Sequence, residues 1–142
     1  MSTPQSDAFG HALQDVWEQH HGNNDGEVAN YIPELSFANP DHFGLAIATV
    51  DGRVRSHGDV EVPFTIQSIS KAFAFAIAIE TVGLENISLR VGLEPSADPF
   101  NAILFDRDNR PFNPMVNAGA IGVSSLLLNA HGKDTFDLVL ER

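Results

Sequence analysis

Hydrophobic residues recur at helical spacing near the start of the chain, which predicts an amphipathic helix that ends close to His20. Positions three and four apart share one side of a helix, so this apolar side is expected to dock on the rest of the protein. Ser6 or Asp7 can cap the helix, because either side-chain oxygen accepts a hydrogen bond from a free N–H group of the first turn. The apolar side consists of Phe9, Leu13, Val16 and Trp17.

A different pattern follows in residues 43–50, where large and small residues alternate, as is typical of a β-strand. Asp51 and Gly52 then favour the tight turn of a β-hairpin, with a second strand over residues 53–57. Neither face of the first strand carries a charged residue. We therefore expect helices to cover both sides of the sheet.

A nearly uninterrupted apolar run over residues 71–79 predicts a helix that other parts of the protein cover on almost every side. After Lys71 the run contains only Ala, Phe and Ile, and Gly83 can end the helix. Its polar groups therefore lie at its start.

The start of this helix contains a Ser-x-x-Lys motif formed by Ser68 and Lys71. Residues three apart lie on one helical face, so the hydroxyl and the amine can approach each other. Partial desolvation favours a neutral amine that can take the serine proton, and free N–H groups of the first turn can hold an oxyanion. The motif predicts an acyl-transfer nucleophile, although a capping serine followed by a solvated lysine gives the same four residues.

A second apolar helix is expected over residues 115–129, after Asn113 as the cap and Pro114 in the first turn. Asn117 would lie one turn inside this helix and be buried. A buried amide needs hydrogen-bond partners, which are either the backbone of the preceding loop or a ligand. The spacing alone does not choose between the two.

Composition narrows the range of partners. The formal net charge of -11 argues against a nucleic-acid or anionic membrane surface and favours a small-molecule substrate. No cysteine is present, and we find no histidines with partners at metal-ligand spacing, so no metal site is predicted. The first residues lack the features of a signal peptide, and no apolar run is long enough to cross a bilayer, so a cytoplasmic location is expected.

The 142 residues provide one β-hairpin, no further clear strand and a last helix that starts at Asp134 and is barely two turns long. A two-stranded sheet is only marginally stable alone. We therefore expect the N-terminal part of a larger domain. Residues 1–63 would hold the first helix and the hairpin, and residues 64–142 the helical part.

Five motifs occur in one order along the chain. They are Tyr31-Ile32-Pro33-Glu34-Leu35, Phe43-Gly44-Leu45-Ala46-Ile47, Gln67-Ser68-Ile69-Ser70-Lys71, Glu94-Pro95-Ser96 with Asp98-Pro99-Phe100-Asn101, and Asn113-Pro114-Met115-Val116-Asn117-Ala118-Gly119-Ala120. Together they resemble the N-terminal half of the bacterial serine-dependent glutaminases, relatives of the serine β-lactamases and penicillin-binding proteins. The resemblance implies an α/β (α+β) fold of the serine β-lactamase-like type, in which helices flank an antiparallel sheet beside a helical subdomain.

The same resemblance implies a reaction. Ser68 would attack the side-chain amide of L-glutamine and release ammonia, and water would hydrolyse the γ-glutamyl ester to L-glutamate. Lys71 would accept the proton, and Ser68 and Asn117 would contact the bound amino acid. The family implies no metal or organic cofactor and a homo-oligomer, either a dimer or a tetramer.

Two other hypotheses fit parts of the pattern. One is a different Ser-x-x-Lys amidohydrolase or penicillin-recognising enzyme, which covalent labelling of Ser68 by a fluorescent penicillin would favour. The other is a non-catalytic binding module. Glutamine binding without turnover that survives Ser68→Ala would favour the module.

Overall fold

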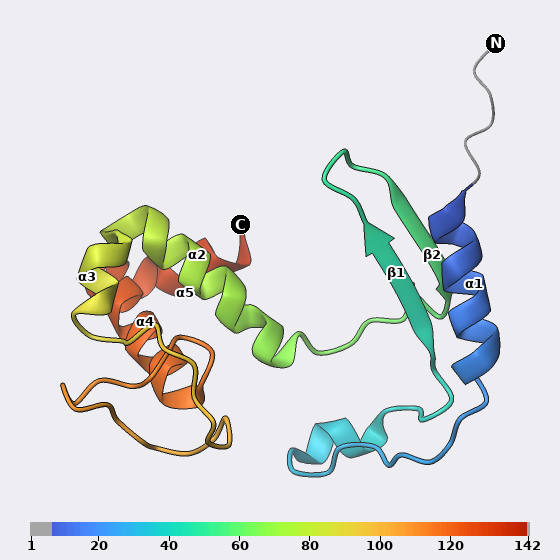
Figure 1. The fold of residues 1–142 in the computed structure, drawn as a ribbon, viewed down its shortest axis with the longest axis horizontal. Coiled ribbons are helices and arrows are strands. Elements are labelled where there is room, and N and C mark those ends of the chain that lie inside the picture. Colours follow the sequence, from blue (N-terminus) through green and yellow to red (C-terminus); the bar gives the residue numbers. More distant parts are fainter. Residues whose placement is uncertain (1–6, 142) are drawn as a thin grey trace. The chain divides into compact units, whose positions relative to one another are not determined.

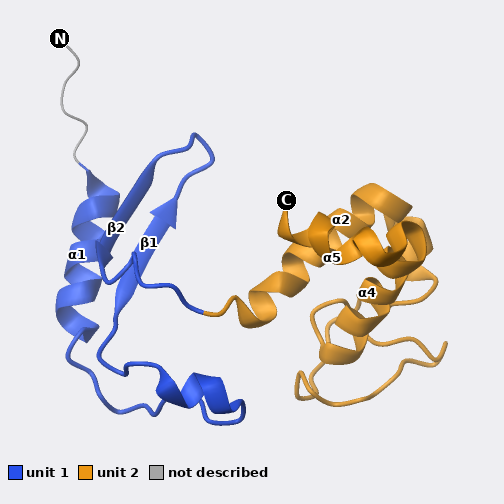
Figure 2. Cartoon of the chain, turned by 180° about the vertical axis from the view of Figure 1, so that it is seen from behind, with its two compact units in different colours: residues 1–64 blue, residues 65–142 orange. Residues whose placement is uncertain are grey.

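The computed structural model describes residues 7–141 of the chain. The chain divides into two compact units, residues 1–64 and residues 65–142 (Figure 2). The first unit combines a helix with a two-stranded sheet. The second is built from helices joined by an irregular segment.

The first unit begins with α1 (Ala8–His20), the predicted amphipathic helix. Asp7 caps it, because its carboxylate accepts a hydrogen bond from the N–H of Gly10 at 3.1 Å. The alternative cap, Ser6, lies outside the described residues. A short 3₁₀ helix, η1 (Pro33–Phe37), separates α1 from the sheet.

The sheet consists of β1 (Gly44–Ala48) and β2 (Val54–Gly58), paired antiparallel (Figure 1). The predicted turn is present, with Gly52 at a φ of 82°. The second strand is displaced by one residue from its expected position. The register pairs Gly44 with Gly58 at one end of the sheet and Ala48 with Val54 at the other.

α1 packs against one face of this sheet through Trp17. The indole Nε1 donates to the Phe43 carbonyl at 3.3 Å, and the indole ring meets the His57 ring edge-on at 4.8 Å. On β1 the large residues are half-buried, whereas Gly44, Ala46 and Ala48 are exposed. Within residues 7–64, α1 is the helix that covers the sheet, and it shields one face.

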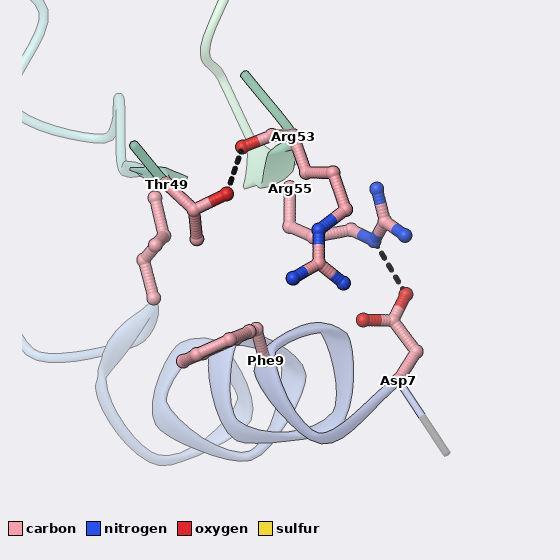
Figure 3. Close-up of a pocket in the computed structure, with 6 residues that line it drawn as sticks. Asp7, Phe9, Thr49, Arg53 and Arg55 are labelled. Atoms are coloured by element: carbon pink, nitrogen blue, oxygen red, sulfur yellow. Dashed lines mark hydrogen bonds and ion pairs between the residues drawn. The ribbon is translucent and has the colours of Figure 1, made fainter. Parts of the chain in front are cut away.

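Two arginines of the hairpin lie where α1 begins (Figure 3). Arg55 donates to the Asp7 carboxylate, and this hydrogen bond holds the pKa of Asp7 below its ordinary value. Arg53 pairs with Asp51 at 2.9 Å. The hollow among these side chains measures about 10 Å³, which is room for about one water molecule. This cluster is therefore a structural contact between α1 and the hairpin.

The second unit contains α2 (Ser70–Val82), α3 (Leu84–Ser88), α4 (Asn117–His131) and α5 (Thr135–Leu140). Two 3₁₀ turns, η2 (Gln67–Ile69) and η3 (Gly132–Asp134), precede α2 and α5. α2 packs against α4, and their contact forms the core of the unit. The buried core residues are Ile77, Ala78, Ile87, Val91, Val123 and Leu127.

α2 is less covered than its apolar sequence predicts. Phe73 is 53% exposed, and Ile79 is 39% exposed. Burial is concentrated at Ile77 and Ala78, which face α4 and α3. Within residues 65–141 α2 packs against α3, α4 and α5, and these neighbours leave part of its apolar surface exposed.

The segment between α3 and α4 is irregular, and Arg110 anchors it. The Arg110 guanidinium donates to the Ser88 carbonyl at 2.6 Å and pairs with Asp106 at 2.8 Å. The Asp106 carboxylate also accepts the backbone N–H of Arg110, and these contacts hold the pKa of Asp106 below its ordinary value. The arginine thus joins the segment to the end of α3.

No helix in the described part of the chain is long and apolar enough to cross a membrane.

Candidate functional site

Ser68 lies in the 3₁₀ turn η2 and is exposed. The preceding residue, Gln67, has a φ of 48°, a left-handed conformation that is uncommon for a residue other than glycine. Ser70 stabilises the turn by donating its hydroxyl to the Gln67 carbonyl at 2.8 Å. The serine is therefore presented on a strained turn, and such strain is frequent at functional sites.

Ser68 therefore lies just before the helix whose start the motif predicts. α2 begins two residues later, at Ser70. The N–H groups that follow Ser68 are occupied, because Ile69 donates to Ile66 at 3.1 Å and Ser70 donates to the carbonyls of Gln67 and Ser68. These two groups are therefore not free donors for an oxyanion.

Lys71 extends from the first turn of α2 toward the start of α4 and is half-buried. Its Nζ donates to the Met115 carbonyl at 3.0 Å and to Asn117 Oδ1 at 2.7 Å. The Nζ also lies 5.8 Å from the centre of the Phe100 ring, within the range of a cation–π interaction. Three groups distant in the sequence thus surround one amine.

Asn117 is the first residue of α4, not a residue one turn inside it, and its side chain is exposed rather than buried. Its side-chain oxygen accepts from Lys71, while its backbone N–H donates to the Phe100 carbonyl at 2.9 Å. The helix starts two residues later than expected because Asn113 caps a separate turn before it. Asn113 Oδ1 accepts the N–H groups of Met115 and Val116 at 3.0 and 3.2 Å.

The two acceptors on Lys71 restrict what its amine can do. A neutral amine has two N–H bonds and one lone pair, so donation to both oxygens leaves the lone pair as the free position. An ammonium has its third N–H at that position. In either state the free position points away from both acceptors, and one proton can be exchanged there.

The structure brings two of the three predicted residues into contact, Lys71 and Asn117. No hydrogen bond within residues 7–141 joins Lys71 to Ser68, which precedes it by three positions. Sequence reasoning did not find the Met115 carbonyl or the Phe100 ring as partners of the amine. A backbone carbonyl leaves no residue-type signal, and Phe100 was noted only as part of a motif.

A cavity of about 420 Å³ lies beside Lys71 in the second unit. Ser70 and Lys71 line its edge, whereas its walls are mainly apolar side chains of α4 and α5, including Leu127, Leu128 and Phe136. Ser68 and Asn117 do not line it. Of the three predicted site residues, Lys71 alone borders this cavity.

Within residues 7–141, no group of three or more His, Asp or Glu side chains could hold a metal ion.

Comparison with known sequences is decisive for the family. The glutaminase family profile matches residues 26–142, which is most of the chain. The chain belongs to the glutaminase family. The five motifs that resemble the bacterial glutaminases lie within the matched residues, so the resemblance is confirmed.

Individual glutaminases support the assignment. Glutaminase 2 of Bradyrhizobium diazoefficiens is 58% identical over 127 residues, which cover 89% of this chain and 20% of that protein. The glutaminase of Nostoc sp. is 48% identical over 130 residues, covering 91% of this chain and 39% of the relative. This glutaminase sequence therefore spans well under half of the length of these relatives.

Solved structures agree. The crystal structure of Mglu in its tris and glutamate form superposes with a TM-score of 0.83 at 40% identity, over 99% of this chain and 31% of that one. The probable glutaminase ybaS gives a TM-score of 0.83 at 34% identity, over 93% of this chain and 43% of that one. The predicted fold class, mixed helix and strand with an antiparallel sheet, is confirmed.

Proposed function

We propose that this chain carries the nucleophile and proton acceptor of an enzyme that hydrolyses the side-chain amide of L-glutamine to L-glutamate and ammonia. The observation that supports this most directly is the contact of Lys71 Nζ with Asn117 Oδ1 at 2.7 Å, one short turn after the exposed Ser68. Family membership supports the substrate, and the similar protein Mglu has a crystal structure in its tris and glutamate form.

In the proposed first step, Ser68 Oγ forms a bond to the amide carbon of glutamine while its proton passes to the Lys71 amine. The carbon–nitrogen bond then breaks, and the proton held by Lys71 goes to the leaving nitrogen, which departs as ammonia. In the second step Lys71 takes a proton from water, whose oxygen attacks the γ-glutamyl ester. Glutamate is released and Ser68 regains its proton.

Asn117 has two parts in this proposal. Its side-chain oxygen orients the Lys71 amine, and its side-chain NH₂ group remains available to a carboxylate or carbonyl of the bound amino acid. The Phe100 ring closes a further side of the amine and limits its contact with water.

The experiment is to incubate the chain with L-glutamine, quench with acid and search peptides by mass spectrometry for a γ-glutamyl ester on Ser68. Ammonia release is measured in the same samples. We expect both signals in the wild type and neither in Ser68→Ala. Ser124→Ala is the matched control, because the Ser124 hydroxyl donates to the Ala120 carbonyl within α4 and has no proposed role. Ammonia release that persists in Ser68→Ala would refute the mechanism.

We also propose a cellular location and an oligomeric state for the enzyme. It would work in the cytoplasm as a homo-oligomer, a dimer or a tetramer, within a serine β-lactamase-like domain. The exposed apolar side chains of the second unit, such as Ile121 at 71% and Phe136 at 71%, support further packing partners. Sedimentation equilibrium tests the oligomer, and a single species with the mass of one chain at micromolar concentration would refute it.

A further inference from the structure

Asn113 ties the irregular segment of the second unit to the start of α4. Its Nδ2 donates to the Glu94 carbonyl at 2.9 Å. Its Oδ1 accepts the backbone N–H groups of Met115 and Val116 at 3.0 and 3.2 Å. One side chain uses both ends of its amide, and it fixes two successive peptide groups directly before the helix.

The segment that Asn113 fixes also presents the two acceptors of Lys71. Met115 donates its N–H to Asn113 and accepts Lys71 Nζ at its carbonyl, at 3.0 Å. Asn117, two residues further on, accepts the same nitrogen at 2.7 Å. A change in the cap would therefore displace both acceptors of the amine together.

A glycine makes this arrangement possible. A Cβ atom built on Gly119 would lie 1.8 Å from the Asn113 carbonyl oxygen and 2.7 Å from its carbon. The backbone of Asn113 is thus seated on the first turn of α4, where only a residue without a side chain permits the approach. The cap is held from two directions, by its own side chain and by this contact.

We propose that Asn113 is a positioning residue for Lys71: it holds the Met115 carbonyl and the Asn117 side chain where they orient the lysine amine. The role rests on the proposed function, in which Lys71 is the proton acceptor. Within residues 7–141 no hydrogen bond joins Asn113 to Lys71 itself. Asn113 acts through the two residues that do contact the amine.

The chain has only two lysines, Lys71 and the exposed Lys133, so each amine can be followed in one sample. Reductive methylation with ¹³C-formaldehyde and cyanoborohydride, read by ¹³C NMR, gives a rate for each, and Lys133→Arg assigns the signals. In the wild type Lys71 should react more slowly, because its nitrogen donates to two oxygens. In Asn113→Ala we expect the ratio of the Lys71 rate to the Lys133 rate to rise by roughly threefold or more.

Three further variants sharpen the test. Asn113→Asp keeps oxygens for both N–H groups and loses the donor to Glu94, so its rate ratio should stay near that of the wild type. Asn39→Ala removes a comparable turn in the first unit, where Asn39 Oδ1 accepts the N–H of Asp41 at 3.0 Å, and should leave the ratio unchanged. Asn113→Ser keeps one shorter acceptor and should give an intermediate ratio.

The positioning role is overturned if Asn113→Ala still melts cooperatively and its rate ratio equals that of the wild type. It is also overturned if the ratio in Asn113→Asp is as high as that in Asn113→Ala. If Asn113→Ala does not fold, Asn113→Ser decides, and a ratio equal to that of the wild type overturns the role. The measurement needs no glutamine. If the rate ratio does not change while hydrolysis still depends on Ser68, the positioning role of Asn113 is wrong and the proposed function is unaffected. If hydrolysis persists in Ser68→Ala, the proposed function is wrong, and the measured effect of Asn113 on the Lys71 rate is unaffected.

Discussion

Lys71 Nζ lies 2.7 Å from Asn117 Oδ1, although the two residues are 46 positions apart in the sequence. The contact joins the first turn of α2 to the first residue of α4, so the packing of these two helices sets the position of the amine. A hydrogen bond from a lysine to a side-chain oxygen is directional. Small displacements between the helices therefore change the chemistry available to Lys71.

Replacement of Lys71 by methionine is the first prediction. Lys71→Met keeps most of the aliphatic stem and removes the nitrogen that we propose as the proton acceptor. We expect kcat for the proposed glutamine hydrolysis to fall by about 10³-fold, within the usual range for loss of a general base, with a smaller change in KM. Lys133→Met is the control and should retain full activity. A Lys71→Met enzyme within threefold of the wild-type kcat would contradict the role of the amine.

Gly119→Ala should destabilise the second unit. The new Cβ would lie 1.8 Å from the Asn113 carbonyl oxygen, so the backbone on one side must move. Overpacking of this kind costs about 3 kcal/mol, and we expect a lower urea midpoint in denaturation followed by circular dichroism. Gly26→Ala is the control, because nothing lies within 4 Å of a Cβ at that position. Equal midpoints for the two variants would show that the contact is not rigid.

The pH dependence of stability should depend on Asp106. Hydrogen bonds from the Arg110 backbone and guanidinium hold the pKa of the Asp106 carboxyl below its ordinary value in the folded chain. The stabilisation is therefore fully present above the unfolded pKa, at about pH 4, and is lost as the pH falls through the lower folded value. We expect the urea midpoint of the wild type to fall below about pH 4 more steeply than that of Asp106→Asn.

Asp41→Asn serves as the control for this titration, because Asp41 is an exposed carboxyl of the first unit. It removes the same charge and should leave the acid slope of the second unit close to that of the wild type. Parallel curves for the wild type and Asp106→Asn would be inconsistent with the stabilising role of the Asp106–Arg110 pair.

The single tryptophan reports on the docking of α1. Gly58 has a φ of 78°, and a Cβ there would lie 2.2 Å from the Phe43 oxygen and 2.5 Å from Trp17 Nε1. Gly58→Ala should therefore displace the indole into water and shift its fluorescence emission to longer wavelength. Gly52 has a similar φ of 82°, but no atom lies within 4 Å of a Cβ built on it. Gly52→Ala is therefore the control, because it introduces the same backbone strain without the steric contact. Emission that shifts equally in both variants would argue against tight docking.

Much of the architecture could be predicted because it depends on local pattern. The periodicity of α1, the Asp51-Gly52 turn and the apolar run of α2 each fix an element without reference to distant residues. The strand boundary was displaced by one residue, and α4 began two residues late. Both errors concern element ends, where a hydrogen bond such as the Asn113 cap decides the boundary.

The candidate site was less predictable because its contacts are tertiary. Ser68, Lys71 and Asn117 were chosen from their motifs, yet the contact between Lys71 and Asn117 depends on how α2 meets α4. The left-handed φ of Gln67 has no sequence signal, since glutamine rarely adopts it. The apolar pattern of β1 and α2 indicates that these surfaces need packing partners, but it does not identify the segments that provide them.

The two-stranded hairpin has a practical consequence for handling the protein. Among residues 7–141, each strand has one outer edge on which backbone N–H and C=O groups are not paired within the sheet. β2 carries the charged Arg55, whereas β1 reads Gly-Leu-Ala-Ile-Ala without a charge. Such an edge is a template for aggregation, and β1 is the strand on which a lysine or a proline would act as a gatekeeper during concentration and storage.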